Sequence, residues 1–362
     1  MQNDIVIAAD SHVYLPADIS APSDWRSETT SLESDIRQGV LENGRIYQTL
    51  RENKIQYAFV THNPYGCNPP PRVQTDFRSV PSDDQMFETY ENSHLLMIIC
   101  DSDLENPLYH APTGKLPKHI LDIGTGKGSW AIDVADMFPS ATVRGVDLFP
   151  PPLSWIPPNC ILEVDDILRS WTWKDPFDLV HIKNLDGSFN AQEQESLYKQ
   201  CYDNIKPGGW IEQLEVSYFI ECDDDSLPGH SVLRSWGPRL AQAAQKAGRP
   251  LGAMHTMRDS IANAGFTDIH VKDYKLPIGP WPRDKQLKEV GEVNHQHWMG
   301  GMEGYGMWLL THFGGPLALG EGGGSGLYCT NEAGAYGYEI SYLSTQSTGL
   351  GEKAGTGTKH RT

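Results

Sequence analysis

The 362-residue sequence has few positive charges and no closely paired cysteines. It contains 29 Lys and Arg against 47 Asp and Glu, which gives a net charge of −18 at pH 7. A chain this acidic repels a phosphate backbone, so nucleic acid is not an expected partner. The six cysteines form no C-x-x-C pair, which argues against a zinc ribbon or a disulfide-dense secreted scaffold.

Long hydrophobic runs and internal repeats are also absent from the sequence. The first thirty residues contain only a five-residue apolar run, at residues 5–9, which is too short for a signal-peptide core or a membrane span. We therefore expect no membrane partner, and a soluble protein of the cytoplasm or the nucleus.

The composition divides the chain into an arm, a central domain and a tail. Residues 1–40 are rich in Ser, Thr, Asp and Pro and are predicted to be disordered. Residues 41–313 form the predicted domain, with a Pro-rich insertion or loop at about 60–80. The tail, residues 314–362, has thirteen Gly among forty-nine residues and is predicted to be largely disordered, with only residues 336–343 resembling a strand.

From residue 118 onward, short β-branched runs alternate with helical patterns, which is typical of a parallel sheet with crossover helices. The expected strands are residues 119–124, 142–146, 161–164, 179–182, 210–216 and 268–276. A helix is expected at 129–138, where Trp130, Val134 and Phe138 recur at helical spacing. Further helix faces are marked by Leu197, Cys201 and Ile205, before a stop signal at 207–209, and by Leu233, Trp236, Leu240 and Ala244.

The segment ILDIGTGKG, residues 120–128, is the most informative part of the sequence. Asp122 ends the first strand, and glycines follow at the alternate positions Gly124, Gly126 and Gly128, at the start of a helix. Glycines let the backbone approach a ligand closely, and the helix N-terminus favours a negative group. A nicotinamide-dinucleotide loop would read G-x-G-x-x-G, but Ser129 stands where its third Gly belongs, so an oxidoreductase is disfavoured.

Acidic residues follow the next two predicted strands. Asp147 ends the second strand, where its carboxylate can accept hydrogen bonds from both hydroxyls of a ribose. Asp165, Asp166 and Ile167 follow the third strand, where an adenine would lie over an apolar side chain with a carboxylate near its amino group. The alternatives are a solvated turn for Asp147 and ordinary surface acidity for Asp165 and Asp166.

These residues together resemble the D/E-x-G-x-G-x-G motif of class I S-adenosylmethionine-dependent methyltransferases. More narrowly, SWIPPN (154–159), WTW (171–173), KPGGWIE (206–212) and LPIGPWP (276–282) resemble the LaeA-like methyltransferases of filamentous fungi. The resemblance covers roughly residues 40–313. It implies an α/β fold of the Rossmann-like class I type, a mostly parallel seven-stranded sheet with helices on both faces, and S-adenosyl-L-methionine as cofactor.

Two departures from the family pattern concern segments outside the motifs. YAF (57–59) is separated from PSDD (81–84) by some twenty Pro-rich residues that the family lacks. After residue 313 the family continues with an acidic helix and a closing strand, whereas this chain continues with the Gly-rich tail. Both departures are open to two explanations, retained introns in a gene model or true divergence, and they leave the closing strand of the sheet in doubt.

The catalytic group is not identified by any motif. His181 and Lys183 point to one face at the end of the fourth strand, and His181 is a weak candidate for a general base beside a structural role. His295 and His297 are spaced i, i+2 on a helix and do not converge, so no metal is expected and a solvated face is predicted for them. The aromatic residues of the C-terminal segment are expected either in a lid over the acceptor or in the core; they are Trp281, Trp298, Tyr305 and Trp308.

Two functions are compatible with the resemblance. The first is methylation of O or N on a small natural-product-like acceptor in fungal secondary metabolism. The second is regulation of secondary-metabolite gene expression by an S-adenosylmethionine-binding protein that acts through protein partners. Glu212 and Glu215 resemble the paired glutamates that bind a guanidinium in protein arginine methyltransferases. In those enzymes the glutamates follow the fourth strand in a Ser-Glu-x-x-Gly motif, which this chain lacks, so arginine methylation is disfavoured.

Overall fold

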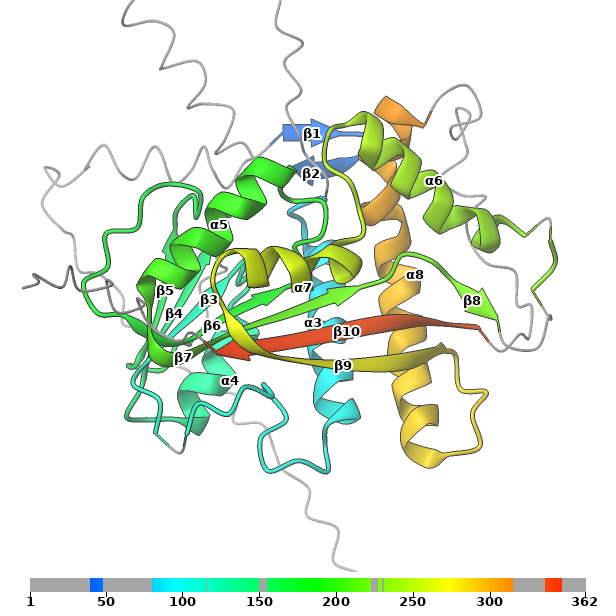
Figure 1. The fold of residues 1–362 in the computed structure, drawn as a ribbon. Helices are drawn as coiled ribbons and strands as arrows, with labels where there is room; N and C mark the ends of the chain where they lie inside the picture. The colour runs from blue at the N-terminus through cyan, green and yellow to red at the C-terminus, as the bar shows by residue number, and fades with distance from the viewer. Residues whose placement is uncertain are drawn as a thin grey trace, which may run out of the picture.

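The computed structural model describes residues 40–47, 80–114, 116–149, 155–222, 227–229, 231–314 and 336–346, for the last of which it describes the backbone alone (Figure 1). The strands are β1 (Val40–Glu42), β2 (Arg45–Tyr47), β3 (His119–Ile123), β4 (Thr142–Asp147), β5 (Cys160–Val164), β6 (Phe177–Lys183), β7 (Ile205–Val216), β8 (Glu221–Cys222), β9 (Thr267–Ile278) and β10 (Tyr336–Gln346). The helices are α3 (Asp84–Cys100), α4 (Ser129–Met137), α5 (Ala191–Asn204), α6 (Val232–Lys246), α7 (Ala253–Asn263) and α8 (Lys285–Phe313). The predicted arm, and most of the predicted insertion and tail, lie outside the described residues.

The main sheet has the expected mixed topology. Strands β5, β4, β3, β6 and β7 are parallel in this spatial order, and β10 is antiparallel between β7 and β9. The two-residue β8 pairs with one end of β10 and adds an eighth strand to the expected seven. This arrangement confirms the predicted α/β fold class.

The closing strand comes from the tail. Residues 340–346 of β10 pair with residues 210–216 of β7, and most of the length of β10 also pairs with β9. The segment singled out in the sequence, 336–343, therefore occupies the place of the closing strand. Without it, β7 and β9 would both expose unpaired backbone groups along one edge.

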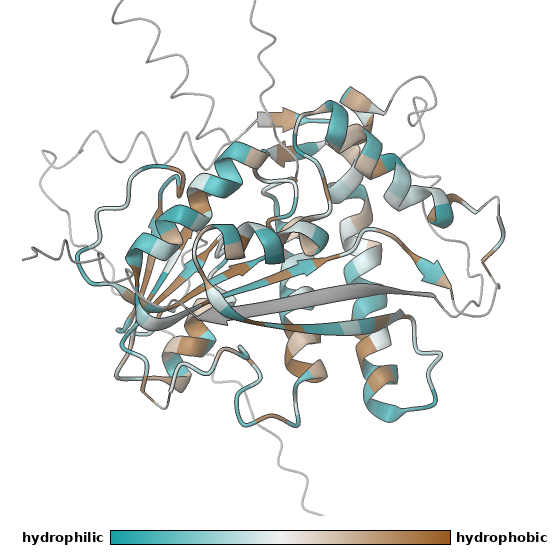
Figure 2. Cartoon of the chain, in the orientation of Figure 1, coloured by the Kyte–Doolittle hydropathy of each residue, from teal (hydrophilic) through white to brown (hydrophobic). Residues whose placement is uncertain are grey.

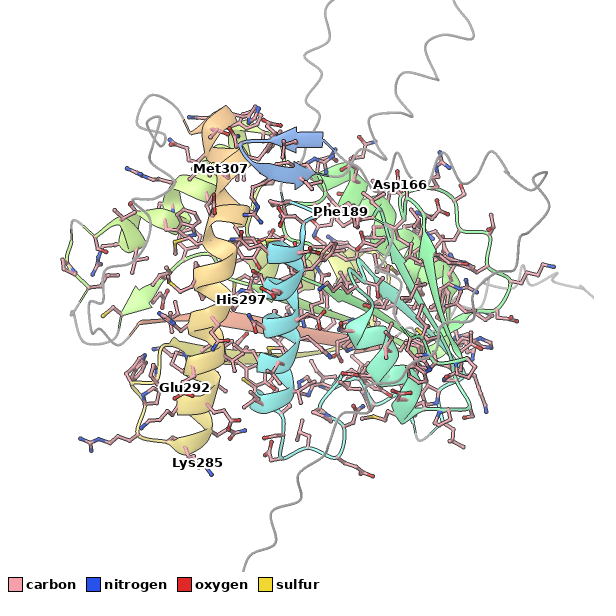
Figure 3. The ribbon with its side chains drawn as sticks, turned by 180° about the vertical axis from the view of Figure 1, so that it is seen from behind. Asp166, Phe189, Lys285, Glu292, His297 and Met307 are labelled. Atoms are coloured by element: carbon pink, nitrogen blue, oxygen red, sulfur yellow. The ribbon has the colours of Figure 1, made fainter. Side chains whose placement is uncertain are left out.

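Helices cover both faces of the sheet. Helices α5 and α7 pack on one face, while α3, α4 and α8 lie on the opposite face (Figures 1 and 3). The parallel strands are predominantly hydrophobic, as expected for strands buried on both faces, whereas α5 turns a hydrophilic surface outward (Figure 2). Alternating residues of β3 illustrate this, because Ile120 contacts the α4 side and Leu121 contacts the α5 side.

A second core joins α3, α6 and α8 to the β1–β2 hairpin. Tyr47 and Trp236 are fully buried in it, and Trp298 and Trp308 of α8 are also buried there. These two tryptophans therefore pack in the core, whereas Trp281 is 46% exposed. The long α8 forms one wall of the site described below.

Two expectations about individual residues are wrong. Ile205 does not belong to the helix face of Leu197 and Cys201, because α5 ends at Asn204 and Ile205 begins β7. His297 is buried rather than solvated, and its Nδ1 lies 2.9 Å from the carbonyl oxygen of Thr89 in α3 (Figure 3). His295 is exposed as predicted.

Candidate functional site

The carboxyl ends of β3, β4 and β6 open into one cavity. In open α/β sheets, ligands bind at this edge, where neighbouring strands have helices on opposite faces. The cavity is lined by the segment after β3, by Asp147 at the end of β4 and by Lys183 at the end of β6, with α3 and Tyr305 of α8 as the far wall. Six of the predicted cofactor residues and His181 contribute to its lining: Asp122, Gly124, Gly126, Asp147, Asp165 and Ile167.

The three glycines after β3 have different surroundings. All three have positive φ angles, which L side chains rarely adopt. A Cβ atom at Gly124 would lie 2.7 Å from Cδ2 of Leu185, and one at Gly128 would lie 2.6 Å from Cδ1 of Leu162. A Cβ atom at Gly126 would have no heavy-atom neighbour within 4 Å. Gly124 and Gly128 therefore allow close packing of the protein, and Gly126 leaves open space at the cavity.

The Asp122 side chain, at the end of β3, stabilises the shape of this loop. It is buried, and one carboxylate oxygen accepts a hydrogen bond from Oγ1 of Thr125 at 2.7 Å. The other oxygen lies 2.8 Å from Nδ1 of His181, whose ring stacks on Trp130 at a centroid distance of 3.7 Å. This environment favours the structural role predicted for His181, because its Nδ1 and one ring face are already used.

Asp147 is held at the loop by two backbone N–H groups. Its carboxylate accepts hydrogen bonds from Gly126 at 2.9 Å and from Phe149 at 3.0 Å. Burial raises the pKa of Asp147 above its ordinary value, although the backbone N–H groups act in the opposite direction. Gly145 of the same strand was not predicted from the sequence as part of the site. A Cβ atom there would lie 2.5 Å from Oγ1 of Thr125, so this glycine allows the loop to pack closely on β4.

The residues after β5 do not all face the same space. Asp165 and Ile167 line the cavity, but Asp166 does not. Asp166, labelled in Figure 3, accepts a hydrogen bond from the N–H of Leu168 at 3.2 Å and lines a neighbouring hollow instead.

The two glutamates of β7 are buried structural acceptors. Glu212 accepts the N–H of His110 at 2.9 Å, and Glu215 accepts the N–H of Asp186 at 3.0 Å. Burial raises the pKa of Glu212, and burial together with the Asp186 charge raises that of Glu215 to about 8. Both carboxyl groups tie loops to the sheet.

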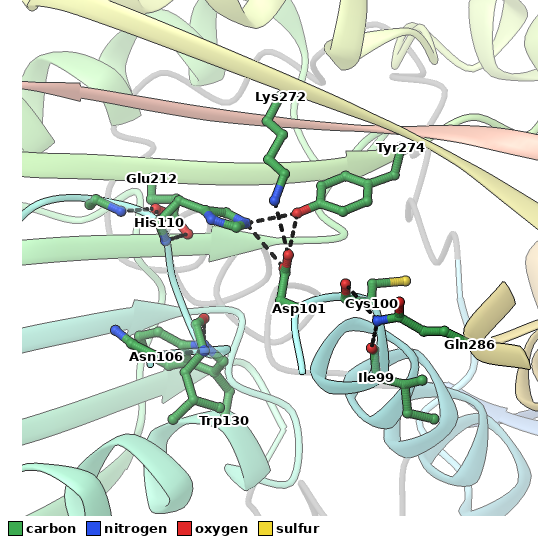
Figure 4. Close-up of polar contacts among 12 residues, drawn as sticks. Ile99, Cys100, Asp101, Asn106, His110, Trp130, Glu212, Lys272, Tyr274 and Gln286 are labelled. Carbon is green, nitrogen blue, oxygen red and sulfur yellow. Dashed lines mark hydrogen bonds and ion pairs between the residues drawn. The ribbon is translucent and has the colours of Figure 1, made fainter. Parts of the chain in front are cut away.

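His110 connects Glu212 to a second polar cluster at the end of α3 (Figure 4). At its centre, Asp101 is buried with its carboxylate 3.1 Å from Nε2 of His110 and 3.0 Å from Nζ of Lys272. The hydroxyl of Tyr274 donates to the same carboxylate. Asp101 does not line the cavity, so the cluster joins α3 to β9.

The wall of the cavity to which α3 contributes was not predicted from the sequence, apart from Tyr305. It includes Tyr90, Glu91 and His94 of α3, with Tyr218 after β7 and Tyr305 of α8. Asp83 caps α3 by accepting the N–H of Met86, and this N-cap pattern is the signal that could have indicated the helix. Of the aromatic residues expected in a lid, Tyr305 is the one that lines the cavity.

Two basic side chains that line the cavity have altered pKa values. Burial lowers the pKa of Lys183 to about 8, while the charges of Asp122 and Glu91 raise it. Burial also lowers the pKa of His94, against its contact with Asp133, where Nε2 lies 2.7 Å from the carboxylate. No group of His, Cys, Asp and Glu within the described ranges is arranged to hold a metal ion.

The comparisons with known proteins agree with this geometry. Residues 120–209 match the family described as "Methyltransferase domain". "Methyltransferase pytC" of Aspergillus terreus is 31% identical over 309 residues, which cover 85% of this chain and 87% of that protein. "Secondary metabolism regulator LAE1" of Cochliobolus heterostrophus is 34% identical over 257 residues, which cover 69% of this chain and 75% of that protein. The chain belongs to the LaeA-like methyltransferase family.

Membership in the LaeA-like family makes the chain an S-adenosylmethionine-dependent methyltransferase, and S-adenosyl-L-methionine is its cofactor. Among solved structures, it is similar to phosphoethanolamine N-methyltransferase 2 of Haemonchus contortus, with 15% identity, a TM-score of 0.40, and coverage of 73% of this chain and 57% of that one. The open space at Gly126 and the carboxylate of Asp147 at the neighbouring strand end fit such a cofactor. Along the described ranges, no helix has both the length and the apolarity to cross a bilayer.

Proposed function

We propose that this LaeA-like protein transfers a methyl group from S-adenosylmethionine to O or N of a small natural-product-like acceptor in fungal secondary metabolism. The observation that carries the proposal is the single cavity that Gly126 and Asp147 share with His94, Lys183 and Tyr305. Gly126 and Asp147 border the space proposed for the nucleoside and amino-acid portions of the cofactor. His94, Lys183 and Tyr305 offer polar and aromatic groups for an acceptor.

In this proposal the cofactor residues have distinct roles. Asp147 accepts hydrogen bonds from the ribose hydroxyls, and Gly126 gives room to the amino-acid end of the cofactor. Asp165 and Ile167 lie beside the adenine. Gly124, Gly128 and Asp122 maintain the shape of the loop after β3. Asp166 stabilises the backbone turn after β5 and does not contact the cofactor in this proposal.

The cofactor, when bound, supplies an electrophilic methyl group on a positively charged sulfur. Displacement from that sulfur disperses charge, so the protein chiefly holds the acceptor in line with the methyl group, which is worth about 7–11 kcal/mol in well-oriented systems. The walls formed by α3 and α8 would serve this positioning, since both contribute side chains to the cavity.

The experiment that tests the proposal combines binding with turnover. Purified protein is titrated with S-adenosylhomocysteine, and then incubated with labelled S-adenosylmethionine and a panel of small natural products that carry hydroxyl or amine groups. The proposal predicts saturable binding and a labelled product. Binding without transfer to any member of the panel would contradict the small-molecule function.

A second candidate is a regulator of secondary-metabolite gene expression that binds S-adenosylmethionine and acts through protein partners. The match to a relative named as a secondary metabolism regulator, over 75% of its length, favours it. Stable co-purification with transcriptional proteins, together with no turnover of small molecules, would support this function over the first.

A further inference from the structure

The cavity contains a buried ammonium group, that of Lys183. Lys183 lies at the end of β6 and lines the cavity with its side chain. Within the described parts of the chain, no hydrogen bond or ion pair joins its Nζ to another residue, and the nearby carboxylates of Asp122 and Glu91 act only through their charge. A largely desolvated cation without a partner favours an anionic group of a ligand.

His94 of α3 lines the cavity and pairs with a carboxylate of α4. Nε2 of His94 lies 2.7 Å from the Asp133 carboxylate, and this contact assigns the Nε2 proton to the hydrogen bond. The Nδ1 lone pair then makes no hydrogen bond to the described residues, and His94 lines the cavity. A neutral imidazole oriented by a carboxylate is the arrangement of a general base.

The charged groups around this pair are compatible with that role. Burial and the Lys183 charge lower the pKa of His94, while the hydrogen bond and charge of Asp133 and the charge of Glu91 act in the opposite direction. His297 of α8 also faces Lys183 and has its pKa lowered to about 4, chiefly by burial, so it adds no positive charge near neutral pH. Of the α3 carboxylates, Glu91 is the one that lines the cavity, and it accepts a hydrogen bond from Ser129.

We propose that the acceptor is an acidic hydroxyl, such as a phenol or an enol, which Lys183 holds as its anion after His94 removes the proton. This inference rests on the proposed function and specifies its acceptor class. The O–H bond breaks with its proton going to Nδ1 of His94. The oxygen then forms a bond to the methyl carbon as the carbon–sulfur bond breaks, and the sulfur keeps that electron pair as a neutral thioether.

The test uses para-nitrophenol as a probe, because its anion is coloured and its neutral form is not. The full chain is saturated with S-adenosylhomocysteine at a pH below the pKa of the free phenol, and the phenol is added. We expect the wild type to bind the probe as its anion. Lys183→Met should lose the anion band and bind the phenol at least about tenfold more weakly, whereas Lys183→Arg should keep the band.

Lys199→Met is the matched control, because Lys199 is an exposed lysine of α5 paired with Asp203, away from the cavity.

The proton that leaves the phenol is followed by calorimetry in buffers of different ionisation enthalpy. The wild type should release almost no proton to the buffer, since His94 retains it, and His94→Gln should release about one proton per phenol bound. Asp133→Asn should fall between these values.

The outcomes separate the two proposals. If the wild type does not bind S-adenosylhomocysteine, the proposed function itself is wrong. If it binds that product but shows no anion band, or does not bind the phenol up to its solubility, the Lys183–His94 assignment is overturned alone. A loss of S-adenosylhomocysteine affinity in Lys183→Met would also overturn it, because Lys183 would then hold the cofactor's carboxylate. Equal proton release by the wild type and His94→Gln would remove His94 as the base.

Discussion

The carboxylate of Asp122 lies 2.8 Å from Nδ1 of His181 on the adjacent strand β6. The parallel register places these residues directly opposite each other, and Thr125 occupies the second oxygen of the same carboxylate. The pair thus links the strand end beneath the glycine loop to the neighbouring strand end that leads to Lys183. The Asp122 side chain therefore holds together the glycine loop and the end of β6, which both line the cavity.

We predict that His181→Ala destabilises the fold more than it alters cofactor binding. The substitution leaves a buried oxygen of Asp122 without its partner, which should lower the free energy of unfolding by about 1–3 kcal/mol. The affinity of the folded variant for S-adenosylhomocysteine should stay within a factor of a few. Chemical denaturation and calorimetry measure the two quantities, with the exposed His295→Ala as control. Unchanged stability would contradict the structural role.

Gly126→Ala and Gly128→Ala should differ in what they impair: Gly126→Ala chiefly cofactor binding, and Gly128→Ala chiefly stability. Both positions have positive φ angles, so both variants share a backbone cost of about 1–2 kcal/mol. In Gly128→Ala, the added Cβ atom also clashes with Leu162. This overpacking should lower the free energy of unfolding by a further ~1–3 kcal/mol.

Gly126→Ala should retain more stability but weaken S-adenosylhomocysteine binding, and Gly126→Val should abolish it. Thermal unfolding and calorimetry on the same samples check this pair. Wild-type affinity in Gly126→Val would show that the open space at Gly126 is not occupied by the cofactor.

Asp101 should make stability dependent on pH. Burial raises the pKa of Asp101, but the hydrogen bonds from His110, Tyr274 and Lys272 outweigh burial and hold it below its ordinary value. A folded-state pKa below the unfolded value of about 3.9 stabilises the protein above that pH, and the stabilisation is lost as the pH falls through the folded-state value.

Asp101→Asn should therefore cost about 1–3 kcal/mol at neutral pH, since it removes a buried charge-assisted acceptor. The difference from the wild type should shrink in acid below the ordinary Asp range. Urea denaturation across pH values measures it. A difference that stays constant from neutral to acid pH would contradict the account of this cluster.

The strands and the glycine loop could be predicted because their signals are local. Residues 119–128 combine a short apolar strand with glycines at fixed spacing, and both features depend only on neighbouring residues. The strand-like segment at 336–343 was also visible in the Gly-rich tail, although the full length of β10, to Gln346, and its pairing with β9 were not predicted.

The far wall of the cavity could not be predicted, because it depends on contacts between distant segments. His94 meets Asp133 from a helix with no recognised motif, and His110 meets Glu212 across 102 positions. His297 was misread because its spacing to His295 says nothing about which helix face α3 covers. The boundary at Ile205 was misplaced because an apolar residue suits both a helix end and a strand start.

The central claim, that the cofactor binds at Gly126 and Asp147, is tested most directly by titrating S-adenosylhomocysteine into the wild type and Asp147→Ala by calorimetry. The account predicts saturable binding to the wild type and an affinity loss of about 1.5–3 kcal/mol in the variant, the scale of hydrogen bonds to a charged group. Circular dichroism of the variant should remain that of the folded protein. Equal affinity in the two proteins, or tighter binding of NADH than of S-adenosylhomocysteine to the wild type, would contradict it.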